Sequence, residues 1–131
     1  EILAKMPSKV VLGLNERESQ RVASVSKSGV FSSLDERLEA IAEAWDFAAV
    51  VYHAREKAVW VGQERVELNW EAIPHPLTLT GAGDHFNAGV IAALSCGCTP
   101  AAALLAGKAV AQNWIQTGQD LSREDFSTLL A

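Results

Sequence analysis

The chain has 131 residues, enough for one domain, and 49% of them are hydrophobic against 21% charged, so we expect a packed core and no extensive disorder. Sixteen acidic and eleven basic side chains give a formal net charge of −5. This balance argues against a dedicated binder of nucleic acid or anionic membrane, because a phosphate backbone requires a positive face. Charged or polar residues interrupt every apolar stretch before the roughly 20 residues of a membrane-spanning helix are reached.

The cysteines and the start of the sequence indicate a cytoplasmic protein. Cys96 and Cys98 lack the further ligands of a zinc site and do not make a disulfide scaffold, so reduced thiols are expected. The first six residues contain no apolar signal-peptide segment. The sequence opens without an initiator methionine, and we expect it to be a piece of a longer protein.

Apolar runs and helical patterns alternate in the first half of the chain. Residues 9–14 predict a buried strand, and residues 16–26 predict a helix. A second helix is expected from the capping box of Ser33 and Glu36 to about Ala44. The side chains expected on the buried faces of these helices are Val22 and Val25, then Leu34, Leu38, Ile41 and Ala42.

The second half is expected to hold a hairpin and three helices. Residues 47–52 predict another buried strand, and two short apolar runs around Gly62 predict a hairpin over residues 58–68. The three helices are expected at residues 82–95, 100–117 and from Ser122 onward. Strands separated by helical patterns indicate an α/β sheet with helices on its faces.

The junction before the helix at residues 82–95 carries the chemistry. The first N–H groups of a helix have no internal partner and lie at the positive end of its dipole. Glycines let the backbone approach an anion, so Gly81, Ala82 and Gly83 are expected to form an anion hole for phosphate. Asp84 then lies where a carboxylate can take a proton from an attacking hydroxyl. The alternative is an ordinary glycine turn with a favourable first-turn acid, and spacing alone does not decide between them.

Residues 81–89 read Gly-Ala-Gly-Asp-x-Phe-x-Ala-Gly, which resembles the second signature of the ribokinase-like (PfkB-type) carbohydrate kinase family. The resemblance implies that the glycine turn is the anion hole and that Asp84 is the catalytic base. Asn15 and Glu18 resemble the family's Asn-x-x-Glu motif, which implies a role in placing Mg²⁺ and its waters against the nucleotide phosphates. From the residues alone, the same pair is a helix cap, and one residue can serve both purposes.

Several positions depart from the family's pattern. Thr78 and Leu79 stand where the family has an aspartate and a threonine. His53 and Arg55 stand at the ends of the family's Thr-x-Gly loop near the nucleotide, and His53 can donate a hydrogen bond as threonine does. Gly107 stands where an asparagine often lies near the adenine. The resemblance therefore places His53 and Gly107, with Asn15 and Glu18, on the nucleotide side.

The resemblance implies a three-layer α/β/α sandwich, the carboxy-terminal part of a ribokinase-like (Rossmann-like) domain. Residues 1–131 are expected to form a single domain, the nucleotide-binding and phosphoryl-transfer half of a sugar kinase. The amino-terminal substrate and lid portion is absent, so these residues alone are expected to be inactive. Asn15 and the turn at Gly81 are expected to face one crevice at the carboxyl ends of the strands.

The implied function is ATP-dependent transfer of a phosphoryl group to a hydroxyl of a sugar or related small molecule. Mg²⁺ is the implied cofactor, a monovalent cation serves some family members, and a homodimer is left open. Two other classes of function stay open as well. A catalytically degenerate member would act as a ligand-binding or interaction module, although such a module needs no base at Asp84. A plain folded fragment would offer an interaction surface only.

Other polar residues carry simpler predictions. His85 is expected on the face of its helix rather than in a proton relay, because it lies about 100° around the helix from Asp84. Asp35, Glu36 and Arg37 are expected to form a solvated polar face.

Overall fold

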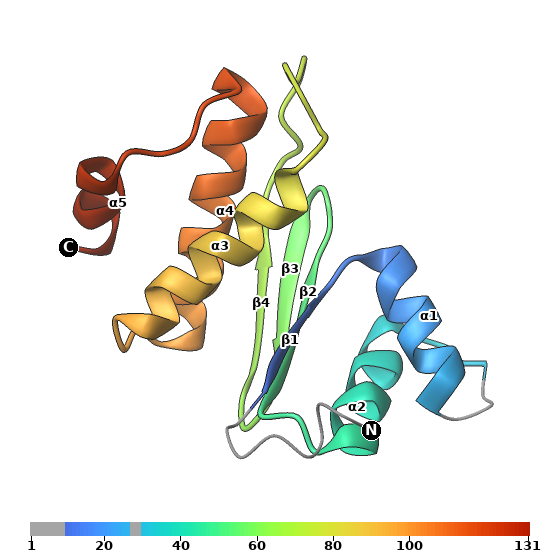
Figure 1. Cartoon of the computed structure of the whole chain (residues 1–131). Coiled ribbons are helices and arrows are strands. Elements are labelled where there is room, and N and C mark those ends of the chain that lie inside the picture. Colours follow the sequence, from blue (N-terminus) through green and yellow to red (C-terminus); the bar gives the residue numbers. More distant parts are fainter. Residues whose placement is uncertain (1–9, 27–29) are drawn as a thin grey trace. The chain divides into compact units, whose positions relative to one another are not determined.

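The computed structural model describes residues 10–26 and 30–131 (Figure 1). The chain forms two compact units that meet in sequence between Glu67 and Leu68. None of the helices in the described ranges is long and apolar enough to cross a membrane. The elements in chain order are β1 (Val11–Leu14), α1 (Glu16–Ser26), α2 (Leu34–Trp45), β2 (Ala49–His53), β3 (Lys57–Val61), β4 (Arg65–Asn69), α3 (Ala82–Ser95), α4 (Pro100–Thr117) and α5 (Arg123–Leu130).

The strands form one sheet in the order β1-β2-β3-β4. β1 pairs with β2 in parallel, with Leu14 opposite Tyr52, and β2 pairs with β3 antiparallel, with Val51 opposite Trp60. A parallel pair requires a long crossover, which α1 and α2 supply, whereas an antiparallel pair needs only a short turn. The first four residues of β2 are buried, so both of its faces are covered. Such burial is typical of a central strand in a three-layer α/β/α sandwich.

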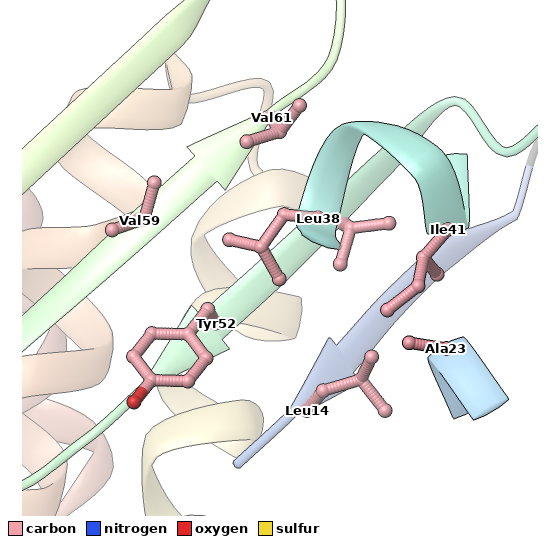
Figure 2. Close-up of a cluster of buried hydrophobic side chains, with 8 residues drawn as sticks. Leu14, Ala23, Leu38, Ile41, Tyr52, Val59 and Val61 are labelled. Atoms are coloured by element: carbon pink, nitrogen blue, oxygen red, sulfur yellow. The ribbon is translucent and has the colours of Figure 1, made fainter. Parts of the chain in front are cut away.

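A hydrophobic core lies between the sheet and the helices α1 and α2. Leu38 and Ile41 are three residues apart on α2, on the same helix face, and both have no exposed surface. Figure 2 shows these two side chains turned toward the strands. Burial of a side chain of this size contributes about 1.5–3 kcal/mol to folding. The cluster consists of Leu14, Ala23, Leu38, Ile41, Val50, Tyr52, Val59 and Val61.

In the second unit, α3 and α4 pack closely through glycines. A Cβ atom at Gly89 would lie 2.7 Å from the carbonyl oxygen of Ala106, and one at Gly107 would lie 2.7 Å from Cγ2 of Val90. Since real Cβ atoms do not approach so closely, only glycine permits this separation of the helices. Helix α5 contacts α4 and has no fully buried side chain.

The capping signals in the sequence locate the helix ends correctly. The side chains of Ser33, Thr99 and Ser122 each accept a hydrogen bond from the backbone N–H of the third residue of α2, α4 and α5, respectively. Helices α1, α3 and α4 have the predicted bounds, and α2 ends one residue later than predicted. The strand predicted to begin at residue 47 begins at Ala49 instead, because the N–H of Phe47 donates to Ala42 at the end of α2.

The predicted inner face of α1 is partly wrong. Val25 is 79% exposed, whereas Ser19 and Ala23 are buried. These two residues are four positions apart and share a face, and their small side chains let α1 pack closely. The buried hydroxyl of Ser19 is satisfied because it donates to the carbonyl oxygen of Glu16 at 2.9 Å.

Candidate active site

Helix α3 begins at a tight turn formed by Leu79, Thr80, Gly81 and Ala82. The N–H of Ala82 donates to the carbonyl oxygen of Leu79 at 3.3 Å. Gly81 has φ 85° and ψ −5°, the angles of the third residue of a type II β-turn. A positive φ at this position favours glycine, which explains why the motif begins with this residue.

Asp84 is exposed in the first turn of α3, next to N–H groups that the helix cannot satisfy itself. Gly81 is the N-cap and offers no side chain as an acceptor. Of the N–H groups of residues 81–84, only that of Ala82 has a backbone acceptor within the described part of the chain. The N–H groups of Gly83 and Asp84 are therefore available to an anion at the positive end of the helix dipole.

A cavity of about 380 Å³ opens beside Asp84 on the second unit. It is large enough for a small ligand, since ligand pockets begin at about 300 Å³. Its lining residues are Asp84, His85, Ala88, Val110, Asp120 and Leu121. Two carboxylates and one imidazole thus meet beside the start of α3.

His85 is held by three neighbours. Its Nδ1 lies 2.8 Å from the carbonyl oxygen of Gly81, and its Nε2 lies 2.8 Å from Oδ1 of Asp120. Its ring stacks on Trp114 with 4.1 Å between centroids and 12° between planes. Burial lowers the pKa of His85, but the hydrogen bonds to Gly81 and Asp120 and the charges of Asp120 and Asp84 outweigh it. The net effect raises the pKa above its ordinary value of 6.5.

Trp114 fixes the approach to the turn. Its indole Nε1–H donates to the carbonyl oxygen of Thr80 at 2.8 Å. One residue further along α4, the carbonyl oxygen of Ile115 accepts the N–H of Leu77 at 2.9 Å. The end of α4 therefore holds the segment that leads into the glycine turn.

In the first unit, Asn15 and Glu18 form a reciprocal helix cap. The N–H of Glu18 donates to Oδ1 of Asn15 at 2.9 Å, and the N–H of Asn15 donates to Oε2 of Glu18 at 2.8 Å. The cap predicted from the residues is therefore present. A carboxylate can accept several hydrogen bonds, so the cap leaves Glu18 capacity for water or a hydrated metal. No group of three or more potential metal-ligating side chains occurs in residues 10–26 and 30–131.

Asn15 and His53 line one cavity of about 480 Å³ at the carboxyl ends of β1 and β2. The other lining residues are Glu16, Arg17, Gln20, Ala54 and Arg55. The structure thus brings together two residues that the family resemblance implies lie on the nucleotide side. Open α/β sheets bind their ligands at this end of the strands.

Glu16 connects this cavity to the core and was not singled out from the sequence. It accepts hydrogen bonds from Nη2 of Arg37 at 2.7 Å and from the hydroxyl of Tyr52 at 2.9 Å. Burial raises the pKa of Glu16, but these two bonds and the Arg37 charge outweigh it, and the net shift is downward. Burial and the bond to Glu16 raise the pKa of Tyr52 to about 12.

The predicted solvated face of Asp35, Glu36 and Arg37 is therefore wrong in part. The Arg37 side chain is only 14% exposed and reaches across to α1. Asp35 accepts from Arg65 of β4 at 2.9 Å, and Glu36 accepts from the N–H of Ser32 at 2.9 Å. Adjacent helical positions point in different directions, so each of the three finds a different partner.

Gly107 has a packing role in this structure. A side chain at this position would meet Phe86 and Val90 of α3, so the position faces the neighbouring helix. We therefore leave Gly107 out of the nucleotide site proposed below.

Asp84 belongs to one compact unit, and Asn15, Glu18 and His53 belong to the other. That they face one crevice stays a prediction.

One of the comparisons with known proteins identifies a family. A sequence profile described as prokaryotic ketohexokinase matches residues 3–131. No curated protein matches the chain significantly.

Several solved structures are similar to the chain over most of its length. Ribokinase from Thermotoga maritima is 24% identical with a TM-score of 0.73, over 92% of this chain and 41% of that one. A phosphofructokinase-2 mutant from Escherichia coli is 14% identical with a TM-score of 0.76, over 98% and 42%. Arabidopsis thaliana ribokinase, complexed with ribose and ATP, is 20% identical with a TM-score of 0.66, over 92% and 40%.

These similarities confirm the predicted fold class, a mixed α/β fold of the ribokinase type. The chain spans about two fifths of the length of each of these three structures. The activity of the whole protein is therefore a matter for proposal.

Proposed function

We propose that this chain, which belongs to the prokaryotic ketohexokinase family, carries the phosphoryl-transfer side of an ATP-dependent sugar kinase. The observation that carries the proposal is the start of α3. There a glycine at φ 85° opens the helix, N–H groups lack acceptors within the helix, and Asp84 is exposed beside them. This arrangement offers a base and an anion hole at one place.

The proposed reaction assigns one step to each of these groups. Asp84 accepts the proton of the substrate hydroxyl while that oxygen forms a bond to the γ-phosphorus of ATP. The bond from this phosphorus to the bridging oxygen breaks, and ADP leaves with the electron pair. The N–H groups of Gly83 and Asp84, with the turn at Gly81, stabilise the negative charge on the transferred phosphoryl group.

The nucleotide side is proposed to lie at Asn15, Glu18 and His53. Asn15 and His53 line the same cavity. Glu18 is exposed and directly follows Arg17, which also lines this cavity. Carboxylate and amide oxygens suit Mg²⁺, which keeps several waters and is held through them. When bound, Mg²⁺ would neutralise charge on the nucleotide phosphates. The proposal also includes binding of a monovalent cation and formation of a homodimer, but it assigns no residue to either.

The family supports a sugar as the substrate. It is described as prokaryotic ketohexokinase, and the similar Arabidopsis ribokinase is complexed with ribose and ATP. We propose a hydroxyl of a sugar as acceptor, with ketohexoses as the first candidates.

A kinase assay on the complete gene product that contains these residues tests the proposal. The assay would measure ADP formation with ATP, with and without Mg²⁺, over a panel of ketohexoses, aldoses, pentoses and nucleosides. Sugar-dependent and Mg²⁺-dependent ADP formation is the expected result. Binding of ATP without turnover on any sugar would instead favour the degenerate, ligand-binding member of the family. No binding at millimolar nucleotide in calorimetry would favour an interaction surface only.

A further inference from the structure

We propose that Trp114 and His85 are positioning residues: they hold the backbone of the glycine turn in place without touching the reacting groups. We call this pair of contacts the clamp. The inference rests on the proposed function, because it assigns these two side chains to the anion hole of that reaction. Both lie in the second unit, as do the turn and Asp84.

The clamp acts on two successive peptide groups. Trp114 Nε1–H donates to the carbonyl oxygen of Thr80, and His85 Nδ1 lies at hydrogen-bond distance from that of Gly81, each at 2.8 Å. In a planar trans peptide, the carbonyl of one residue and the N–H of the next point in opposite directions. Fixing the carbonyls of Thr80 and Gly81 therefore also fixes the two peptide planes that lead directly into Gly83 and Asp84, whose N–H groups form the proposed anion hole.

His85 is itself fixed on its far side and on its face. Its Nε2 lies 2.8 Å from the carboxylate of Asp120, and its ring stacks on Trp114. Both ring nitrogens thus face acceptors, and only the doubly protonated imidazolium can donate to both. Asp120 is 86% exposed, but the backbone before it is tied down, because Asn113 Nδ2 donates to the carbonyl oxygen of Gln119 at 2.8 Å.

The local geometry of the turn requires neither the Trp114 nor the His85 side chain. A type II turn followed by a helix requires only the glycine and the backbone hydrogen bond from Ala82 to Leu79. That hydrogen bond is long, at 3.3 Å, so the turn is held weakly by itself. The contacts from Trp114 of α4 and from His85 of α3 compensate for this weakness in the turn that leads into the proposed anion hole.

The test compares three variants of the complete gene product. Trp114→Phe removes the indole N–H and keeps an aromatic ring for His85. His85→Ala removes the contact to Gly81, and His85→Asn restores a neutral donor at nearly the same position. Trp45→Phe and His75→Asn are matched controls, since Trp45 packs on Phe47 in the other unit and His75 is exposed in a loop.

Kinetics give the first readout. Misplacement of the catalytic groups lowers kcat, so Trp114→Phe and His85→Ala are expected to lose about 10- to 100-fold in kcat with little change in KM for the sugar. His85→Asn is expected to recover most of the loss. Unchanged kcat in both Trp114→Phe and His85→Ala, or equal losses in the two control variants, would overturn the proposal.

Hydrogen exchange gives a second readout that needs no activity. If the clamp holds the turn, deuterium uptake by residues 79–84 is expected to rise about tenfold in rate in Trp114→Phe and to stay unchanged in Trp45→Phe. Unchanged uptake in the folded Trp114→Phe protein would overturn the clamp even in a protein with no kinase activity. Absent kinase activity in the wild type, with faster uptake in Trp114→Phe, would overturn the proposed function and leave the clamp standing.

Discussion

Each ring nitrogen of His85 lies 2.8 Å from an oxygen, one of the Gly81 carbonyl and one of the Asp120 carboxylate. The sequence predicts this residue on the face of α3, but not its partners, because Asp120 lies 35 positions further along the chain. Nothing in a local pattern could connect them. Asp120, in the loop after α4, therefore favours the protonated form of His85.

His85 should titrate above the ordinary pKa of 6.5, because its partners favour the charged ring. A raised pKa in the folded state means that the stabilisation is fully present below pH 6.5 and is lost as the pH rises through the folded pKa. The effect on stability is expected to be small, about 1 kcal/mol or less, since Asp120 is exposed. NMR titration of the His85 ring signals checks the pKa.

Asp120→Asn supplies the comparison for this titration. It should move the His85 pKa down toward its ordinary value, whereas Glu71→Gln, which removes a charge at another exposed position, should leave it unchanged. Identical His85 titration curves in wild type and Asp120→Asn would contradict the assigned contact.

At the scale of elements, the packing of α3 on α4 depends on Gly89 and Gly107. Gly107→Ala is expected to destabilise the protein by about 1–3 kcal/mol, the usual cost of overpacking. Helix propensity alone predicts the opposite sign, since alanine is favoured over glycine by about 1 kcal/mol within a helix. Denaturant unfolding followed by circular dichroism measures the difference.

Leu105→Ala is the control for this substitution, because Leu105 lies on the same helix and is half exposed. A surface change of this kind should stay within about 0.5 kcal/mol. If Gly107→Ala were more stable than wild type, the close approach of the two helices would be wrong.

Elements with local signals were predictable from the sequence. Ser33, Thr99 and Ser122 locate three helix starts because each cap satisfies N–H groups within its own first turn. The start of α3 was predictable as well, from a glycine that the turn requires.

Contacts between distant elements were not predictable. Arg37 belongs to a polar sequence cluster, yet it is mostly buried against Glu16 of another helix. The apolar side chain of Val25 predicts burial, but the residues that α1 buries are Ser19 and Ala23. The same holds for the candidate site. The sequence motif predicts Asp84, whereas the contacts of Trp114 with Thr80 and of Asp120 with His85 join residues more than 30 positions apart and are seen only in the structure.

For the whole molecule, the proposal needs groups from both compact units. Glu18 caps α1 and is also proposed to support Mg²⁺, and one substitution can separate these two roles. Glu18→Gln keeps a side-chain acceptor for the N–H of Asn15, and glutamine is accepted at this position of a capping box. Stability should therefore change little. The Mg²⁺ concentration required for half-maximal turnover is expected to rise about 10- to 100-fold, as for other residues that support a metal indirectly.

Glu18→Ala also removes the acceptor for the N–H of Asn15, so it is expected to be less stable as well as to require more Mg²⁺. Glu39→Gln, at an exposed position of α2, should change neither property. A Glu18→Gln protein with the Mg²⁺ requirement of wild type would reduce Asn15 and Glu18 to a helix cap.

The most direct measurement is the turnover number of Asp84→Asn in the complete gene product, with ATP and its best sugar. Asparagine keeps the size of the side chain but cannot accept the proton, so kcat is expected to fall by about 10²–10⁴. Loss of one favourable charge at a helix start costs only about 0.3–1 kcal/mol, so the protein should stay folded and bind nucleotide. Near-normal turnover with a modest loss of stability would contradict the account, because Asp84 would then be only a first-turn acid.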